Sequence, residues 1–205
     1  MRYTLGLMQS WEDIKRWRKA ERARLLEQRR ALPLAERERL GTAIAEKLAA
    51  LPELSGAPCR VGFYWPIRGE PDMRPFVRSL LEKGFEAALP VVVERNAPIE
   101  FYRWTAETKL TRQEVWGIPI PAVRDVVVPD VLLVPLVGFD DAAYRLGYGG
   151  GYYDRTLATF VRKPRAIGLG YELARLETIY PQPHDIPMDI IVTESRLMRR
   201  EEGTS

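Results

Sequence analysis

Arg145-Leu-Gly-Tyr-Gly-Gly-Gly-Tyr-Tyr-Asp-Arg155 gathers four glycines, three tyrosines, two arginines and one acid into a single short segment. The apolar run Val131-Leu-Leu-Val-Pro-Leu-Val137 before it predicts a buried strand, and residues 152–161 have helical spacing. The glycines are therefore expected where a strand hands over to a helix. Glycine allows a positive φ and a close backbone approach, while unpaired amides at a helix start attract anions. The segment predicts a phosphate-binding loop. The alternative is a tight turn whose tyrosines fill the core.

This loop matches neither of the two best-known nucleotide loops. Gly147-Tyr-Gly149 begins a G-x-G pattern, but Tyr152 stands where a Rossmann fingerprint has its third glycine. A Walker loop requires Lys and then Ser or Thr after its last glycine, whereas Gly151 is followed by Tyr152 and Tyr153. A different kind of nucleotide loop is expected.

Strand and helix patterns alternate along the rest of the chain. The βαβ pattern over residues 60–93 predicts two parallel strands, with Asp72 capping the helix between them. Residues 105–129 are expected to be irregular. The alternation indicates an α/β fold, a three-layer sandwich around a mostly parallel sheet. Strands are expected at 60–65, 87–93, 99–104, 131–137, 165–170 and 190–193, and helices at 11–31, 33–51, 72–83 and 152–161.

Length and composition favour a single domain in a reducing compartment. The 205 residues are 46% hydrophobic, enough for one core, so residues 11–194 are expected to form one domain with flexible ends at 1–10 and 195–205. Cys59 is the one cysteine, which excludes an intrachain disulfide and favours the cytoplasm. The sequence contains no run of 18 apolar residues and no export signal at its N-terminus, so neither a membrane span nor export is expected.

Positive charge is concentrated near the N-terminus. Residues 1–31 hold nine Arg or Lys against four acids, although the formal net charge of the whole chain is +3. Arg18 and Arg22 lie four residues apart on one face of the expected helix and so can reach one polyanion together. The alternative is a solvated basic face.

Several motifs together carry a resemblance to the 5-formyltetrahydrofolate cyclo-ligase (methenyltetrahydrofolate synthetase) family. Gly138-Phe-Asp140 followed by the 145–155 segment is similar to the signature of that family. Phe63-Tyr-Trp-Pro-Ile-Arg-Gly-Glu-Pro-Asp72 resembles its strand and substrate loop, Trp116-Gly-Ile-Pro119 its mid-chain turn, and His184-Asp-Ile-Pro-Met-Asp189 its acidic motif. The likeness extends from about Arg18 to about Glu194.

The resemblance implies an ATP-dependent conversion of 5-formyltetrahydrofolate to 5,10-methenyltetrahydrofolate, in which the formyl oxygen is phosphorylated and N10 closes the ring. Mg²⁺ is implied beside ATP, and a monomer without nucleic-acid or membrane partners is expected. It assigns Glu70 and Tyr152 to catalysis, Trp65, Glu70 and Tyr152 to the folate substrate, and Asp154 and Asp185 to the metal. It assigns ATP binding to Arg18, Arg22, Arg145, Gly147, Tyr148, Gly149, Gly150, Gly151, Tyr152 and Tyr153.

Each assigned side chain also has a structural alternative. Asp154 could cap its helix, and Asp185 could form an Asx-turn before a proline. Glu70 could be an exposed acid and Trp65 a core residue. His184, the sole histidine, is interpreted as a turn residue, because the implied chemistry needs no general base there.

The sequence departs from the family pattern at several positions. Arg18 replaces a lysine, Ala143 a glycine and Ile120 an acid. Tyr148 and Gly150 stand where some members carry basic residues, so the positive charge must come from Arg145, Arg155 and the N-terminal helix. Three other functions stay open: a noncatalytic nucleotide- or folate-binding protein, another small-molecule kinase, and a nucleic-acid-binding module built on the basic helix.

Overall fold

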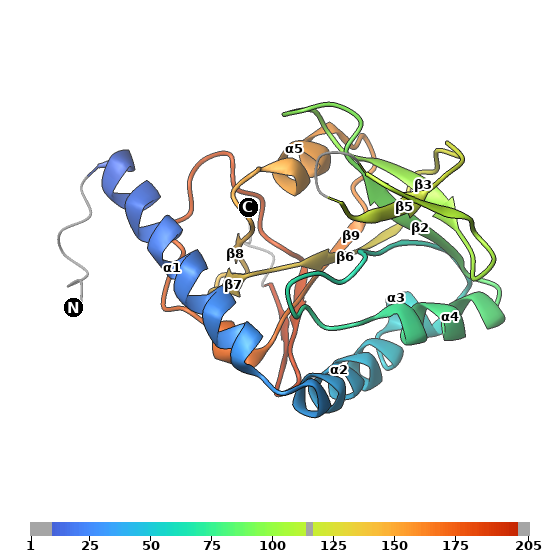
Figure 1. Cartoon of the computed structure of the whole chain (residues 1–205), viewed down its shortest axis with the longest axis horizontal. Helices are drawn as coiled ribbons and strands as arrows, with labels where there is room; N and C mark the ends of the chain where they lie inside the picture. The colour runs from blue at the N-terminus through green and yellow to red at the C-terminus, as the bar shows by residue number, and fades with distance from the viewer. Residues whose placement is uncertain (1–9, 114–116, 201–205) are drawn as a thin grey trace.

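A seven-stranded sheet with helices on both faces forms the centre of the molecule (Figure 1). The computed structural model describes residues 10–113 and 117–200. The strand order is β11-β10-β9-β6-β1-β2-β3. The five inner strands run parallel, while β3 and β11 pair antiparallel at the edges. The α/β sandwich expected from the sequence is confirmed. The strands of this sheet are β1 (Arg60–Gly62), β2 (Glu86–Val91), β3 (Glu100–Trp104), β6 (Val131–Pro135), β9 (Arg165–Leu169), β10 (Ile190–Val192) and β11 (Leu197–Arg199).

Each face of the sheet carries its own hydrophobic core. Val131 and Leu133 of β6 belong to one core, whereas Leu132 and Val134 belong to the other, as the side-chain alternation of a strand requires. The first core is closed by α2 (Leu34–Ala49), α3 (Pro52–Ser55) and α4 (Arg74–Glu82). The second is closed by α1 (Trp11–Ala31), α5 (Tyr152–Thr159) and the loops around them. Figure 1 shows α2, α3 and α4 together on one side of the sheet and α5 on the other.

The long helix α1 buries an unusual set of side chains. Its N-cap is Ser10, whose hydroxyl accepts a hydrogen bond from the Asp13 amide. Its buried residues are Leu25 and two arginines, Arg18 and Arg29. Because a buried guanidinium needs hydrogen-bond partners, α1 must dock on polar groups of the chain as well as on the core.

Three sequence-based expectations are corrected. The glycine segment does not directly follow the strand at 131–137, because the hairpin of β7 (Gly138–Phe139) and β8 (Arg145–Leu146) intervenes. Asp72 is not the N-cap of α4; that residue is Met73, although Asp72 Oδ1 accepts from the Arg74 amide at 3.0 Å. The chain past residue 194 is not a free end, because β11 pairs with β10. Residues 1–9 and 201–205, also expected to be flexible, lie outside the described residues.

The segment expected to be irregular contains ordered pairing. The strands β4 (Leu110–Arg112) and β5 (Pro119–Pro121) form a hairpin. The outer edge of β3 is covered, because the Arg103 amide donates to Asp125 O and the Val127 amide donates to Phe101 O, both at 2.8 Å. In the ranges 10–113 and 117–200, no helix is long and apolar enough to cross a membrane.

Candidate active site

The residues predicted to bind ligands converge on the point where the strand order of the sheet reverses. From β1 the chain moves to β2 on one side, and it later places β6 on the other side of β1. Loops that leave the carboxyl ends of the parallel neighbours β1 and β6 therefore lie at the same end of the sheet. In open α/β sheets this is the usual place for a ligand. The loop after β1 carries Trp65 and Glu70, and the chain after β6 leads through β7 and β8 to the glycine segment.

The glycine loop is held in a conformation that other residues rarely adopt. Gly149 has φ +94°, and Gly151, the N-cap of α5, has φ +63°. A Cβ on Gly150 would stand 2.8 Å from the ring of Tyr152, so this position has no space for a side chain. Arg155 donates to the Gly150 carbonyl, and its guanidinium lies 5.0 Å from the centroid of the Tyr152 ring. These contacts fix the loop at the start of α5.

Arg22 contacts this loop directly from α1. Its Nε donates to the Gly147 carbonyl at 2.7 Å, and its guanidinium lies beside Gly149. Burial and the neighbouring charge of Arg18 lower the pKa of Arg22. An anion bound at the loop would relieve both effects, because it would supply the negative charge that the surroundings lack.

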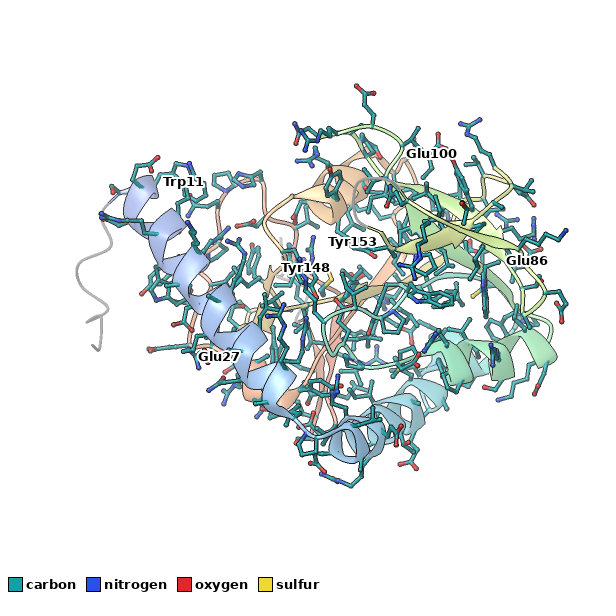
Figure 2. The ribbon with its side chains drawn as sticks, viewed as in Figure 1. Trp11, Glu27, Glu86, Glu100, Tyr148 and Tyr153 are labelled. Carbon is teal, nitrogen blue, oxygen red and sulfur yellow. The ribbon has the colours of Figure 1, made fainter. Side chains whose placement is uncertain are left out.

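Glu70 lies at the centre of a buried polar cluster. Only 6% of it is exposed. Its Oε1 accepts from the Tyr148 hydroxyl at 2.6 Å, and its Oε2 accepts from the Ile67 amide at 2.8 Å. Burial raises the pKa of Glu70, although these hydrogen bonds and the charges of Arg29 and Arg68 favour its ionised form. Figure 2 shows Tyr148 between α1 and the sheet. The interpretation of Glu70 as an exposed acid is wrong.

The Glu70–Tyr148 hydrogen bond joins two parts of the predicted site. Tyr148 was expected at the nucleotide, but in the structure its hydroxyl bonds the residue expected at the folate. Tyr152, assigned to catalysis and to both substrates, packs over the glycine loop beside Gly150 and Arg155. Trp65 is half-buried, and the guanidinium of Arg74 lies 4.7 Å from the centroid of its ring.

The two predicted metal ligands each pair with an arginine. Asp185 Oδ2 lies 2.5 Å from Arg18 Nη2, and both side chains are almost fully buried. Asp154 Oδ1 lies 3.0 Å from Arg145 Nη2 and also accepts from the Ile186 amide at 3.0 Å. Burial by itself raises the pKa of Asp185, but hydrogen bonds from Arg18 and from the Gln182 amide outweigh it and hold this pKa below its usual value.

The Arg18–Asp185 and Arg145–Asp154 pairs affect which side chains are free to bind phosphate and which are free to bind a metal. Arg18 also donates to the carbonyls of Ile179 and Tyr180 at 2.9 and 2.8 Å, so it binds the chain near Asp185 while Arg22 binds the glycine loop. The two side chains still lie close enough for the charge of Arg18 to lower the pKa of Arg22, so a joint contact with one polyanion stays a prediction. The side chain of Asp154 is 20% exposed, compared with 11% for Asp185. Asp154 therefore fits a magnesium ion beside bound phosphates better, since Mg²⁺ needs one or two carboxylates and keeps several waters.

No complete metal cage is preformed in the described part of the chain. Within residues 10–113 and 117–200, no group of three or more His, Cys, Asp or Glu side chains is arranged to hold a metal. A magnesium ion that is shared with nucleotide phosphates does not require such a group. His184 is largely exposed and packs edge-on against Trp11, with ring centroids 6.1 Å apart, consistent with a turn residue.

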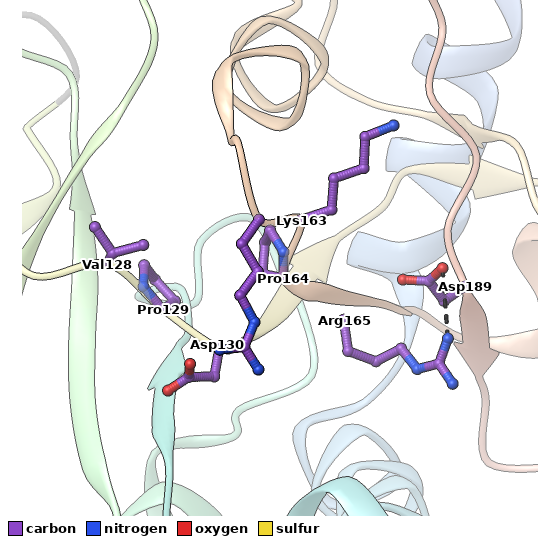
Figure 3. A pocket seen from close by; sticks show the side chains of 8 residues that line it. Val128, Pro129, Asp130, Lys163, Pro164, Arg165 and Asp189 are labelled. Atoms are coloured by element: carbon purple, nitrogen blue, oxygen red, sulfur yellow. Dashed lines mark ion pairs between the residues drawn. The ribbon is translucent and has the colours of Figure 1, made fainter.

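A separate open pocket lies at the opposite end of the parallel strands, where their amino ends meet (Figure 3). Its volume is about 360 Å³. It lies where β6 and β9 begin, whereas the glycine loop lies past the strand ends. None of the residues predicted for the active site lines it. Its lining residues are Val128, Pro129, Asp130, Arg162, Lys163, Pro164, Arg165 and Asp189.

Sequence reasoning missed one buried residue of this site, Arg29. It is 4% exposed and donates to the Tyr148 hydroxyl at 2.5 Å. The helical spacing could have pointed to Arg29. It follows Arg18 by eleven residues and Arg22 by seven, about three and two helical turns, so all three arginines lie on one face of the helix. Its partner could not be found in this way, because the contact spans 119 residues of sequence.

The fold and site define an α/β protein with a glycine-rich loop at the switch point of its sheet. A model of the 5-formyltetrahydrofolate cyclo-ligase family matches residues 14–194, and the chain belongs to that family. It is similar to the 5-formyltetrahydrofolate cyclo-ligase of Escherichia coli K12, with 31% identity over 178 residues that cover 83% of this chain and 97% of the relative.

Two solved structures have the same fold. The 5,10-methenyltetrahydrofolate synthetase of Aquifex aeolicus superposes with a TM-score of 0.79 at 34% identity, covering 92% of this chain and 95% of that one. The 5,10-methenyltetrahydrofolate synthetase of Mycoplasma pneumoniae superposes with a TM-score of 0.71 at 28% identity, covering 86% and 98%. The family resemblance inferred from the motifs is confirmed.

Proposed function

We propose that this chain catalyses the ATP-dependent conversion of 5-formyltetrahydrofolate to 5,10-methenyltetrahydrofolate, with release of ADP and phosphate. Family membership supports the overall reaction. The hydrogen bond between Glu70 and Tyr148 is the structural observation that supports it best, because it joins the loop assigned to folate to the loop assigned to the nucleotide. Phosphate transfer requires the two substrates to be held close together, and adjacent loops for folate and nucleotide would do this.

The chemistry begins at the formyl group. Its oxygen attacks the γ-phosphorus of ATP, the bond to the bridging oxygen breaks, and ADP leaves. N10 then attacks the activated formyl carbon, and the phosphate leaves with the former formyl oxygen as N10 loses its proton. Phosphorylation is needed because an oxide is a poor leaving group and phosphate is a good one. No protein nucleophile takes part, so alignment and charge stabilisation are the main tasks of the chain.

The residues divide these tasks. The glycine loop amides and Arg22 bind the phosphates, with Arg155 and Tyr152 fixing the loop. Arg145 orients Asp154. Asp154 would hold Mg²⁺, which would neutralise charge on the phosphates, and Asp185 would support this site through its pair with Arg18. Glu70 accepts hydrogen bonds from the pterin, Trp65 and Tyr152 contact the folate, and Tyr153 belongs to the nucleotide side. The covered edge of β3 favours a monomer, which light scattering in solution would test.

A coupled assay tests the reaction. ADP release and methenyl-folate absorbance are followed with 5-formyltetrahydrofolate, ATP and Mg²⁺, and each component is omitted in turn. Equal amounts of the two products are expected, with an absolute requirement for all three components. Binding of ATP and folate without methenyl formation would instead identify a noncatalytic binding protein. ADP release without methenyl formation when another acceptor is supplied would identify a different kinase.

A nucleic-acid-binding role has little support from the basic helix. Arg18, Arg22 and Arg29 bind groups of their own chain, and Lys15 and Arg24 lie 3.9 and 2.6 Å from acids one turn away. The face that could attract a phosphate backbone is therefore largely occupied or neutralised.

A further inference from the structure

We propose that Arg29 is a positioning residue of the folate site: its guanidinium fixes the direction of the Tyr148 hydrogen bond and thereby keeps the Glu70 carboxylate ionised and oriented. The inference deepens the proposed function and rests on it for the role of Glu70. Arg29 itself touches no substrate in this scheme. It acts through Tyr148.

Arg29 connects three separate segments at the site. Its Nε donates to Arg68 O at 3.1 Å in the loop after β1, and its Nη1 donates to Leu136 O at 3.0 Å just past β6. Its Nη2 donates to the Tyr148 hydroxyl at 2.5 Å in the glycine loop. All three guanidinium nitrogens are thus used, by partners on both sides of the switch point. A planar guanidinium suits this task, because its donors have fixed directions.

The donor chemistry fixes the polarity of the chain of hydrogen bonds. A guanidinium has donors and no acceptor, so the oxygen of Tyr148 must accept from Arg29. The single hydroxyl proton of Tyr148 is then directed to Glu70 Oε1, while the Ile67 amide donates to Oε2. Both carboxyl oxygens accept, which is the arrangement that an ionised carboxylate satisfies best. Without Arg29, the Tyr148 hydroxyl could turn and accept a hydrogen bond from the protonated carboxyl of a neutral Glu70.

The hydrogen bonds from Tyr148 and from the Ile67 amide favour the ionised form of Glu70 most, followed by the charge of Arg29. Burial opposes ionisation, and Tyr64, Tyr153 and Tyr171 lie close enough for its charge to raise the pKa of their hydroxyl groups. Besides Arg29, the cation that favours the ionised form is Arg68, which is exposed and lies with its guanidinium 5.3 Å from the centroid of the Tyr148 ring. Arg29 is the buried cation of this cluster, where solvent screens its charge less.

The test combines a direct titration with kinetics. The pKa of Glu70 is measured by ¹³C NMR of glutamate-labelled protein, with Glu70→Gln to assign the signal, in the wild type, Arg29→Met, Arg29→Lys, Tyr148→Phe and the double variant Arg29→Met/Tyr148→Phe. The pH profile of kcat/KM for 5-formyltetrahydrofolate is recorded for the same proteins. Arg24→Met, on the exposed face of the same helix, is the matched control. Circular dichroism confirms folding.

In Arg29→Met, the pKa of Glu70 is expected to rise by about one unit, as is usual when a nearby opposite charge is lost. The acidic limb of the pH profile for 5-formyltetrahydrofolate should move to higher pH by the same amount. At a fixed pH below the limb, kcat/KM should therefore be about tenfold lower than in the wild type. The KM for ATP should change less than about twofold. Arg29→Lys keeps a donor-only cation and should restore much of the wild-type profile. Tyr148→Phe should reproduce the shift.

Two results would overturn the proposal. One is an unchanged Glu70 titration in Arg29→Met. The other is a Glu70 pKa that rises as much from Tyr148→Phe to the double variant as it does from the wild type to Arg29→Met. Arg29 would then act on Glu70 without the Tyr148 hydroxyl. If Arg29→Met does not fold, the test uses Arg29→Lys and Tyr148→Phe. A Glu70 pKa in Tyr148→Phe equal to that of the wild type would also reject the proposal. Since the NMR titration needs no turnover, a failure of the proposed reaction in the wild type is distinguishable from a failure of this inference.

Discussion

The side chain of Glu70 is buried, and its carboxylate accepts hydrogen bonds from two donors, the Tyr148 hydroxyl and the Ile67 amide. Its burial raises its pKa, so the ionised form is lost at a higher pH than for an ordinary glutamate. If ionised Glu70 binds the pterin, folate use must fall as the pH drops through this raised pKa. The wild type is therefore expected to show an acidic limb above about pH 4.3, the usual pKa of glutamate.

Glu70→Gln tests this role, because it preserves size and removes the charge. We expect the KM for 5-formyltetrahydrofolate to rise about tenfold or more, the KM for ATP to change little, and the acidic limb to disappear. Steady-state kinetics from pH 5 to 8 provide the measurement, with the exposed Glu82→Gln as control. Identical wild-type and Glu70→Gln kinetics would show that the carboxylate does not contact folate.

Asp154→Asn separates a metal ligand from a structural acid. An asparagine oxygen can still accept from the Ile186 amide, so the fold should survive, but it supplies no negative charge to a hard cation. Turnover at low Mg²⁺ should fall by about tenfold or more and recover partly at high Mg²⁺. The measurement is a magnesium titration of ADP release. Overlapping curves would remove Asp154 from the metal site and leave it a structural acid, bound to Arg145 and to the Ile186 amide.

At the scale of elements, the glycine loop allows binding and turn geometry to be tested separately. A Cβ at Gly147 meets no described atom within 4 Å, whereas Gly151 has φ +63° and a Cβ there would lie 2.9 Å from Arg155 Nη1. Gly151→Ala should cost about 1 kcal/mol or more of stability through its left-handed backbone. Gly147→Ala should leave the thermal midpoint unchanged but raise the KM for ATP, since a methyl group would separate the backbone from a phosphate. Unchanged kinetics in Gly147→Ala would favour a simple turn.

The regular elements were the part of the fold that sequence could predict. The helix at 11–31 has the predicted bounds, and the main strands lie where apolar runs placed them, because burial on both faces selects such runs. The two short hairpins and β11 were not predicted. Their strands contain two or three residues, too few to show a period, and their pairing partners are set by tertiary contacts.

The site was predictable to the level of its loops but not of its pairings. The motifs identified Glu70, the glycine loop and both aspartates as separate groups. They could not show that Tyr148 bonds Glu70 or that Arg18 bonds Asp185, because these contacts join residues 78 and 167 positions apart. Arg29 carries no motif at all, and the polar contacts that explain its burial appear only in the folded chain.

At the scale of the whole molecule, two glycines with opposite surroundings test the packing of the sheet. A Cβ at Gly62 in β1 would lie 2.5 Å from Leu132 Cδ2, whereas a Cβ at Gly41 in α2 would have its nearest neighbours at 4.0 Å. Gly62→Ala should lower the free energy of unfolding by about 1–3 kcal/mol through overpacking. Gly41→Ala should raise it by about 0.5–1 kcal/mol, because alanine favours a helix interior. Urea unfolding of both variants provides the comparison, and equal effects would contradict this view of the core.

The docking of α1 also has a consequence for the order in which the protein acquires activity. A ribosome makes α1 early, yet most of the groups that Arg18, Arg22 and Arg29 bind lie 107 to 167 residues later, at Leu136, Gly147, Ile179 and Asp185. The carbonyl of Arg68, 39 residues after Arg29, is the exception among them. The helix must wait for these partners, because contacts so distant in sequence form only after the intervening chain exists. A nascent chain arrested before residue 136 would contain Glu70, Arg18, Arg22 and Arg29 without a nucleotide loop for them to bind. Synthesis itself thus delays catalysis until the last third of the chain has emerged.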